Sequence, residues 1–149
     1  MAETRAYVVD ASVAAKWYLR DEPFTREALA VYKQFIDGEV ALLAPEQIHY
    51  EVPNAITVAT WTSPPRLTYE EGRTAIDEFL SLGLTTFTDS ELIAAAYPLT
   101  WRYRCAYYDA IYVALAERTG YPLVTADARL YRRIMALPLA LWLGDLAIA

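Results

Sequence analysis

Four carboxylates stand at the edges of apolar segments of this 149-residue chain, where a charged side chain is costly to place unless something binds it. Asp10 ends YVVD, Glu51 lies within APEQIHYEVPNA, Asp109 lies within YYDAIYVALAE, and Asp127 ends YPLVTAD. Two like charges about 4 Å apart repel by roughly 4 kcal/mol at an effective dielectric near 20, so converging carboxylates need a cation. Because hard oxygen ligands suit Mg²⁺ and Mn²⁺, these acids predict a metal site.

The elements that must position these acids alternate between strand and helix. We expect strands at 6–9, 40–44, 84–87, 123–124 and 139–143, and helices at 13–19, 23–36, 46–61, 68–82, 107–118 and 127–135, with a further helix after Thr88 that Pro98 limits or kinks. Such alternation predicts a parallel α/β sheet, in which ligands collect at the carboxyl ends of the strands. Asp10 and Asp127 stand at two such ends.

The helix expected at 46–61 carries Glu51 and Asn54 three residues apart, which places them on a shared edge. Pro53 lies inside this helix, where proline deletes a backbone hydrogen bond and clashes one turn back. We therefore predict a kink near His49 that helps to aim Glu51.

Two helix starts carry capping signals. Ser12 is expected to be the N-cap of the first helix, and Thr88 with Glu91 is expected to form a capping box. Asp89, next to that box, is interpreted as a helix-start residue and not as a metal ligand.

The length of the chain predicts a single domain over residues 1–149, and its hydropathy predicts a partner. The hydrophobic fraction of 56% and the mean hydropathy of +0.14 predict apolar surface buried against another molecule, and we expect a homodimer. The longest uncharged apolar stretch, 134–144, is shorter than the ~20 residues of a membrane-spanning helix. The N-terminus does not resemble a secretory signal, so we expect a cytoplasmic protein without a membrane segment.

Single residues and net charge exclude several other chemistries. Cys105 is the only cysteine and His49 the only histidine, which excludes an intramolecular disulfide, a cysteine-based zinc site and a histidine-rich metal site. We expect His49 to be a packing or surface residue. A net charge of −6 argues against broad, non-specific binding of nucleic acid, which needs a positive surface.

Three segments and their order resemble the PIN-domain family, specifically the VapC-type toxin ribonucleases of toxin-antitoxin pairs. The segments are YVVDASVAAKWYL, APEQIHYEVPNAI and YYDAIYVALAERTGYPLVTAD, and the match spans nearly the whole chain. The resemblance implies a PIN-like three-layer α/β/α fold around a central, mainly parallel sheet of four to five short strands. Two departures are Pro53, where the family usually has a small residue, and the bulky YPLTWRYR stretch before Asp109.

The resemblance also implies a site and its partners. The family's acidic quartet, which binds Mg²⁺ or Mn²⁺ and hydrolyses RNA, corresponds to Asp10, Glu51, Asp109 and Asp127. Its supporting polar positions correspond to Ser12, Asn54 and Thr125. A homodimer is implied, together with a VapB-type antitoxin whose peptide tail occupies the groove near the acids.

A metal ion held by these acids would lower the pKa of a bound water and stabilise charge on a phosphate, as phosphodiester hydrolysis requires. We expect Asp10 and Asp127 to be ligands, Asp109 a ligand directly or through water, and Glu51 a ligand or the group that orients the water. One ion and two ions both fit. Candidate phosphate contacts in the segments around the acids are Arg102, Arg104, Arg129, Arg132 and Arg133.

Other classes fit less well. A receiver-type signalling domain uses a late lysine, whereas no lysine follows Lys33, and a haloacid-dehalogenase-like phosphatase needs a second aspartate where Ser12 stands. Taken singly, each acid could instead be a helix cap or a solvated element end. The alternative that stays open is a PIN-like module that binds RNA or protein with little catalytic turnover.

Overall fold

A computed structural model describes residues 5–147 and places five short strands in one sheet. The strands are β1 (Arg5–Val9), β2 (Val40–Pro45), β3 (Thr85–Phe87), β4 (Leu123–Thr125) and β5 (Ala140–Trp142). Their order across the sheet is β3-β2-β1-β4-β5, and every neighbouring pair is parallel. In the register of the central strands, Val8 lies opposite both Leu43 and Leu123. The expected parallel sheet is confirmed.

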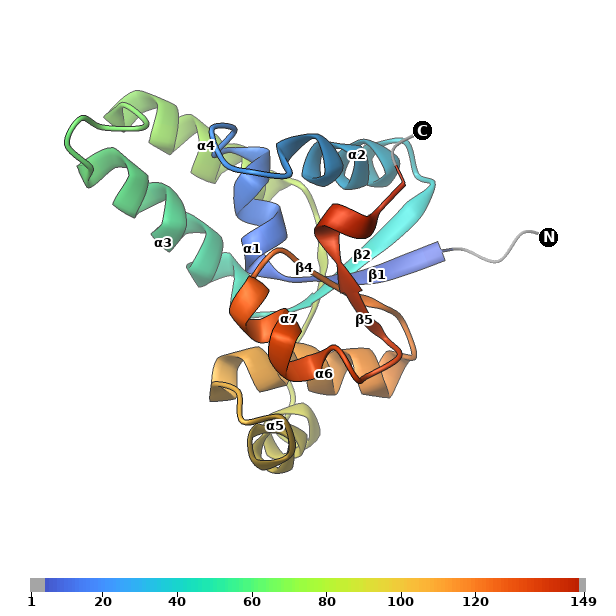
Figure 1. The fold of residues 1–149 in the computed structure, drawn as a ribbon. Helices are drawn as coiled ribbons and strands as arrows, with labels where there is room; N and C mark the ends of the chain where they lie inside the picture. Colours follow the sequence, from blue (N-terminus) through green and yellow to red (C-terminus); the bar gives the residue numbers. More distant parts are fainter. Residues whose placement is uncertain (1–4, 148–149) are drawn as a thin grey trace.

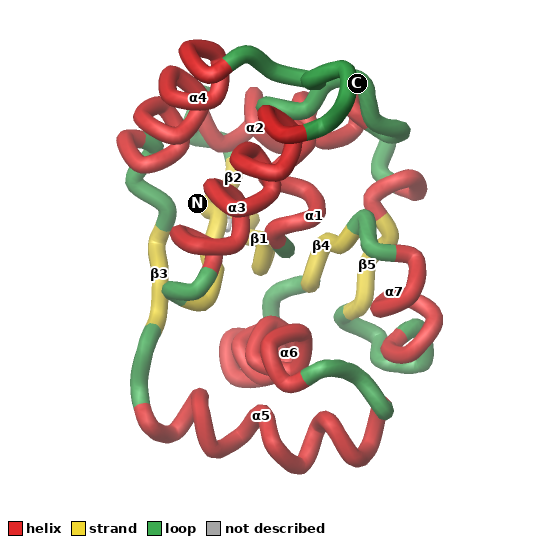
Figure 2. The backbone as a smooth tube through the Cα atoms, turned by 90° about the vertical axis from the view of Figure 1, so that its left-hand side faces the viewer, coloured by secondary structure: helices red, strands yellow, loops and turns green. Residues whose placement is uncertain are grey.

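Helices cover both faces of this sheet (Figures 1 and 2). The helices are α1 (Ala11–Ala14), continued by the 3₁₀ helix η1 (Ala15–Trp17), α2 (Thr25–Ile36), α3 (Ile48–Trp61), α4 (Tyr69–Ser81), α5 (Ser90–Tyr103), α6 (Tyr107–Thr119), α7 (Ala128–Ile134) and the 3₁₀ helix η2 (Leu143–Asp145). Figure 2 shows α1 to α4 on one side of the strands, α5 and α6 on the other, and α7 beside β5. This is the three-layer α/β/α arrangement that the resemblance implied.

The core explains why these segments adopt these elements. Strands covered on both faces should be nearly continuous apolar runs, and in β1 both Val8 and Val9 are fully buried. Helix α6 is buried along seven successive residues, 110–116, as expected for a helix that packs against the sheet on one side and against α5 on the other. These two elements carry Asp10 and Asp109 at their ends, so a rigid core fixes the acids' backbones.

Helices α3 and α4 project together beyond the end of the sheet in Figure 1. Their close approach depends on Gly72, where an added Cβ would lie 2.9 Å from Cγ2 of Thr60. Helix α4 begins with a capping box, in which the Thr68 hydroxyl accepts from the backbone N–H of Glu71 and the Glu71 carboxylate accepts from that of Thr68. The projecting pair is therefore packed closely.

Two expected caps are wrong. The first helix begins at Ala11 with Asp10 at the N-cap, and the Ser12 hydroxyl donates to the Asp10 carboxylate instead of capping. The N-cap of α5 is Asp89, whose carboxylate accepts from the backbone N–H of Leu92, and not Thr88. Since Asp89 also pairs with Arg118, its interpretation as a helix-start residue is confirmed.

Several helix boundaries also differ from expectation. Helix α2 starts at Thr25 because Phe24, with φ of +63°, breaks the helical geometry before it. Helix α3 starts at Ile48, since Pro45 still belongs to β2, and it continues through Pro53 to Trp61. Helix α5 likewise continues through Pro98 to Tyr103, so this proline does not limit it.

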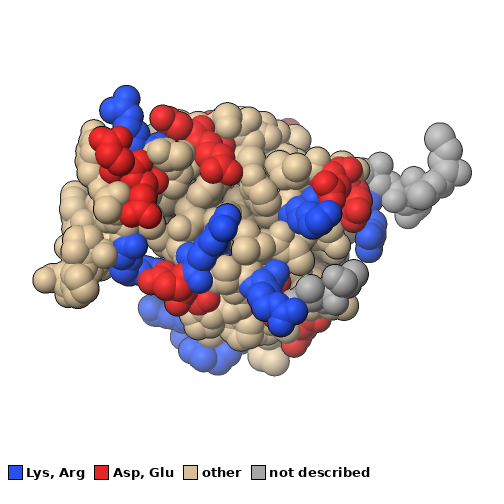
Figure 3. All heavy atoms as spheres, turned by 90° about the horizontal axis from the view of Figure 1, so that it is seen from above, with Lys and Arg blue, Asp and Glu red and all other residues tan. Residues whose placement is uncertain are grey.

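The surface charge is mixed on the face seen from above in Figure 3, where acidic and basic side chains alternate across a largely uncharged surface. Over the part of the chain that the structure describes, no helix is both long enough and apolar enough to cross a membrane.

Candidate active site at the carboxyl end of the sheet

Asp10 is the most buried of the four acids, with 5% of its surface exposed. It follows β1, and its backbone N–H bonds to the carbonyl of Val124 in β4 at 3.0 Å. Its Oδ2 accepts from the hydroxyl of Ser12 at 2.7 Å and from that of Thr125 at 2.8 Å. Burial raises the pKa of Asp10, the two hydroxyl hydrogen bonds lower it, and the charge of Asp127 raises it. The sheet thus holds the Asp10 carboxyl group at a buried position, where its ionised form is energetically costly.

Ser12 and Thr125 also tie the end of β1 to the start of α7. The backbone N–H of Ala126 donates to the Ser12 hydroxyl at 2.9 Å, and that of Asp127 donates to the Thr125 hydroxyl at 3.0 Å. These bonds fix the relative positions of Asp10 and Asp127. Both polar residues therefore lie where the sequence analysis placed them, against the acids.

Asp127 caps helix α7 and faces the site at the same time. Its Oδ1 accepts from the backbone N–H groups of Arg129 at 2.9 Å and Leu130 at 3.1 Å. Both capping bonds use one carboxylate oxygen, so the second oxygen takes no part in the cap. The helix-cap role and a role at the site are compatible for this residue.

Glu51 lies in the first turn of α3 and is fixed by a residue that the sequence analysis missed. The buried hydroxyl of Tyr112 donates to Glu51 Oε1 at 2.8 Å. Burial raises the pKa of Glu51, the Tyr112 bond lowers it, and the charge of Asp10 raises it. The signal for Tyr112 was its place one helical turn after Asp109, since a buried tyrosine hydroxyl needs a partner.

Asp109, in the first turn of α6, is the least anchored acid. Burial raises its pKa most, the charges of Asp10, Asp127 and Glu51 add to the rise, and Arg129 lowers it, which together bring the pKa of Asp109 to about 6. No hydrogen bond from the described residues holds its carboxylate. The charges of the other three acids therefore oppose the ionisation of Asp109.

The donor set fits a hard divalent cation in its chemistry, because four carboxylates offer only oxygen ligands. Within residues 5–147, however, no three aspartate, glutamate, histidine or cysteine side chains lie close enough together to hold a metal ion. The hydroxyl bonds to Asp10 and the tyrosine bond to Glu51 hold these two groups in place, while Asp109 has no such restraint. The acids are gathered at one edge but are not drawn into one coordination shell.

Two hollows are lined by the three acids other than Asp10. The first, of about 430 Å³ and called the Glu51 hollow here, is lined by Ala11, Ser12, Ala15, Lys16, Leu19, Glu22, Glu51, Asn54, Ala55 and Ala126. The second, of about 180 Å³ and called the Asp109 hollow, is lined by Arg104, Cys105, Ala106, Asp109, Asp127, Arg129, Leu130 and Arg133. Of the expected site residues, Ser12, Glu51 and the exposed Asn54 line the first hollow, Asp109 and Asp127 line the second, and Asp10 and Thr125 line neither.

The candidate phosphate contacts separate into two groups. Arg104, Arg129 and Arg133 line the Asp109 hollow. Arg102 instead approaches Glu117, with Nη1 3.8 Å from Oε1, and Arg132 is an exposed residue that lines neither hollow. Only the first three accompany the acids in this structure.

Cys105 and His49 have no chemical role that the geometry supports. Burial and the charge of Asp109 raise the pKa of the Cys105 thiol, which keeps it protonated at neutral pH. His49 contacts Glu46 through Nδ1 at 2.9 Å and packs edge-on against Phe79. The expectation of a packing or surface histidine is confirmed.

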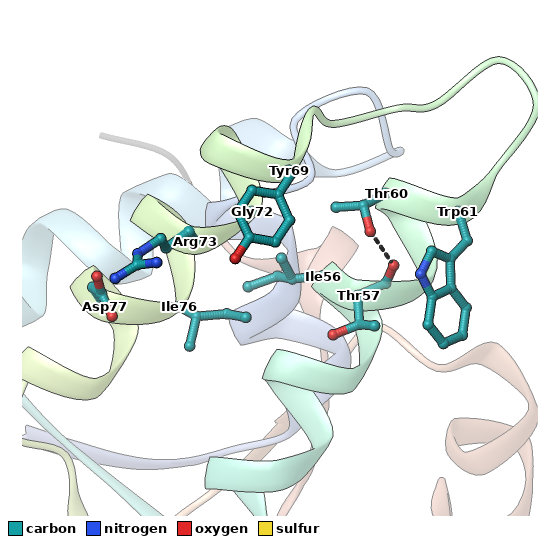
Figure 4. A pocket seen from close by; sticks show the side chains of 9 residues that line it. All are labelled: Ile56, Thr57, Thr60, Trp61, Tyr69, Gly72, Arg73, Ile76 and Asp77. Carbon is teal, nitrogen blue, oxygen red and sulfur yellow. Dashed lines mark hydrogen bonds between the residues drawn. The ribbon is translucent and has the colours of Figure 1, made fainter.

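A further hollow between α3 and α4 contains none of these acids. It encloses about 290 Å³ and is lined by Ile56, Thr57, Thr60, Trp61, Tyr69, Gly72, Arg73, Ile76 and Asp77. Figure 4 shows Trp61 at one end and Asp77 at the other, with Ile56 and Ile76 between them. Its lining is mainly apolar, with Arg73 and Asp77 as its charged residues, so this hollow offers no cluster of acids.

Comparison with known proteins places this arrangement in a family. The model of the PIN domain family matches residues 7–134. Ribonuclease VapC12 of Mycobacterium tuberculosis is 34% identical over 123 residues, which cover 83% of this chain and 88% of that protein. Ribonuclease VapC3 of Pyrobaculum aerophilum is 31% identical over 134 residues, which cover 87% and 95%. This chain belongs to the PIN domain family.

A solved structure agrees on the fold. The crystal structure of PAE2754 from Pyrobaculum aerophilum superposes with a TM-score of 0.64 at 22% identity and covers 95% of this chain and 93% of that chain. The resemblance to VapC-type PIN proteins stated from the sequence is confirmed by these matches.

Proposed function

We propose that this protein is an endoribonuclease that depends on Mg²⁺ or Mn²⁺ and acts as the toxin of a type II toxin-antitoxin system. The observation that carries the proposal is the gathering of Asp10, Glu51 and Asp109 at the carboxyl end of the sheet, where burial first and the charge of neighbouring acids second raise the pKa of each. Burying such acids together is costly to stability, and clusters of perturbed acids in a cleft are typical of functional sites. The ribonuclease names of the curated relatives supply the substrate class.

Each acid has a distinct part in this proposal. Asp10, Asp109 and Asp127 would hold the ion, and Glu51 would be a further ligand or would orient the attacking water. A bound divalent cation supplies an activated water and stabilises the charge that develops on the phosphate. The hydrogen bonds from Ser12 and Thr125 favour the ionised form of Asp10, and the bond from Tyr112 favours the ionised form of Glu51. Asn54, exposed beside Glu51, would contact substrate or water from the Glu51 hollow.

Two macromolecular partners complete the proposal. We infer a VapB-type antitoxin whose tail lies near the acids, and a second copy of this chain. Large apolar side chains that stay exposed support both inferences, since isolated surfaces rarely keep so many aromatic groups in water. They include Tyr50, Trp61, Tyr69, Tyr97, Trp101 and Tyr108.

The proposal is tested by a cleavage assay on single-stranded RNA with added Mg²⁺ or Mn²⁺. Cleavage should stop in chelator and return with metal, and Asp10→Asn should lower its rate about a thousandfold, because the ion contributes several kcal/mol to the transition state. Asp77→Asn, an exposed acid of α4, serves as the matched control and should cleave normally. Cleavage that persists both in chelator and in Asp10→Asn would overturn this mechanism. RNA or protein binding without any cleavage would favour the binding module instead.

A further inference from the structure

Lys16 is a buried cation beside the acids that the proposed mechanism has not used. It has 6% of its surface exposed, and it lies in η1, four residues after Ser12. This spacing puts both side chains on one helical face. Ser12, Ala15, Lys16 and Leu19 from that face line the Glu51 hollow, opposite Glu51, Asn54 and Ala55 of α3.

The hydrogen bond of Lys16 leaves much of its donor capacity unused. Its Nζ reaches Glu22 Oε1 at 3.2 Å, a long contact for an ion pair, and an ammonium group has three donors. The other oxygen of Glu22 is shared, since Arg66 Nη2 donates to Oε2 at 2.8 Å. One carboxylate therefore serves two cations.

The Glu51 hollow is lined by two carboxylates, those of Glu22 and Glu51, so a phosphate that enters it needs a cation to bind. Of the described residues that line the Glu51 hollow, Lys16 alone is cationic. The Asp109 hollow, by contrast, has three arginines. A strand of RNA that crosses the acids has phosphates on both sides of the cleaved linkage, and each needs a positive group to offset the carboxylates.

We propose that Lys16 binds a phosphate of the RNA strand on the Glu51 side of the acids and so positions the substrate. This inference rests on the proposed nuclease function, because it takes single-stranded RNA as the ligand. In the proposed complex, the Lys16 ammonium donates to a phosphate oxygen, and Glu22 competes with that phosphate for the same cation. Lys16 is a positioning residue and takes no proton in the reaction.

The competing interpretation is that Lys16 only ties η1 to the following turn through Glu22. The two interpretations predict different effects of a Glu22 substitution on the affinity for RNA. If Lys16 binds phosphate, loss of the Glu22 charge frees the cation and tightens RNA binding. If the pair is only a structural tie, Glu22→Gln and Lys16→Met both weaken folding and neither changes the affinity for RNA in a salt-dependent way.

The experiment measures binding of a fluorescent single-stranded RNA of mixed sequence by anisotropy over a range of salt, with Mg²⁺ present. The Asp10→Asn variant is the background, so that the RNA stays intact. Adding Lys16→Met should weaken binding about threefold to tenfold and reduce the slope of log affinity against log salt by about 0.7, the value for one contact to a single strand. Adding Glu22→Gln should tighten binding severalfold.

Lys33→Met is the matched control, since the chain has no third lysine and Lys33 is exposed on α2 and paired with Asp37. It should leave affinity and salt slope unchanged. Unchanged binding in Lys16→Met, or weaker binding in Glu22→Gln, overturns the inference. If Lys16→Met does not fold, Glu22→Gln decides: tighter binding supports phosphate contact, and unchanged or weaker binding overturns it. Failure here leaves the metal-dependent cleavage assay unaffected, so the two proposals fail separately.

Discussion

The Glu51 hollow and the Asp109 hollow differ in how firmly their acids are held. In the Glu51 hollow, the carboxylate is fixed by the buried hydroxyl of Tyr112, and the one cation, Lys16, is already paired with Glu22. In the Asp109 hollow, the Asp109 carboxylate has no hydrogen bond from described residues, and three arginines stand around it. The Glu51 carboxylate is therefore held in place before any ligand binds, whereas the Asp109 carboxylate is unrestrained and is repelled by the neighbouring acids.

This difference indicates a division of labour. A group that must aim at a water or a phosphate benefits from being held in place in advance, which Tyr112 provides for Glu51. A carboxylate that must move to bind an ion benefits from conformational freedom and from electrostatic repulsion that the ion relieves. Asp109 has both properties. The predictions below weaken one side and leave the other intact.

The largest effect is expected from Tyr112→Phe, which removes the hydrogen bond to Glu51 and leaves the packing of the ring. Metal-dependent cleavage should fall about tenfold to a hundredfold, the usual cost of losing a group that orients an active-site ligand. The pKa of Glu51 should rise further, because the bond from Tyr112 lowers it. Tyr107→Phe is the control, since the Tyr107 hydroxyl of the same helix donates to the carbonyl of Ile93 in α5. Equal rates in the two variants would refute the anchoring role.

The next effect concerns the stability of the metal-free protein. The folded-state pKa of Asp109, about 6, lies above its ordinary value of 3.8, so the stabilisation from its protonated form is complete below about pH 3.8 and is lost as the pH rises through about 6. Asp109→Asn should therefore unfold in urea with a free energy about 1 kcal/mol above wild type at pH 7.5, after allowance for partial solvent exposure. The difference should vanish at pH 3.5.

Asp89→Asn is expected to change the free energy of unfolding in the opposite direction. The Arg118 guanidinium lowers the pKa of Asp89, so its charged form stabilises the fold above its ordinary pKa and this variant should lose stability at pH 7.5. If Asp109→Asn also loses stability at that pH, the repulsion inferred for the Asp109 hollow is absent.

The smallest effect separates the arginines. Arg129→Gln should weaken binding of single-stranded RNA about threefold and lower its salt dependence, because Arg129 lines the hollow with the acids. Arg102→Gln should change binding less, since Arg102 approaches Glu117 and lines neither hollow. Equal losses for the two variants would show that the RNA path extends beyond the Asp109 hollow.

The sequence was most informative where chemistry and position coincide. Asp10 and Asp127 follow apolar strands, so the pattern alone predicted that both stand at the carboxyl edge of the sheet, and the parallel pairing of β1 with β4 brings these two ends together. Glu51 and Asp109 lie on different helices, and their approach required the resemblance to the family as well as the pattern.

Other features depend on packing that no local pattern reveals. Ser12 was expected to cap a helix by its position, yet its hydroxyl bonds to Asp10 because β4 brings Thr125 and Ala126 against it. Neither Lys16 nor Tyr112 was expected at the site, and only the fold puts them beside Glu51. Pro53 and Pro98 are tolerated inside helices whose tertiary packing outweighs one lost hydrogen bond each.

The central claim, that the four acids bind a divalent cation together, is tested most directly by calorimetric titration of Mn²⁺ into the wild-type protein and into Asp10→Asn. The account predicts that wild type binds Mn²⁺ at pH 7.5, that it releases more protons on binding at pH 6 because carboxylates with raised pKa must ionise, and that Asp10→Asn binds at least tenfold more weakly. Equal affinity of the two proteins for Mn²⁺, or no binding by either, would contradict it.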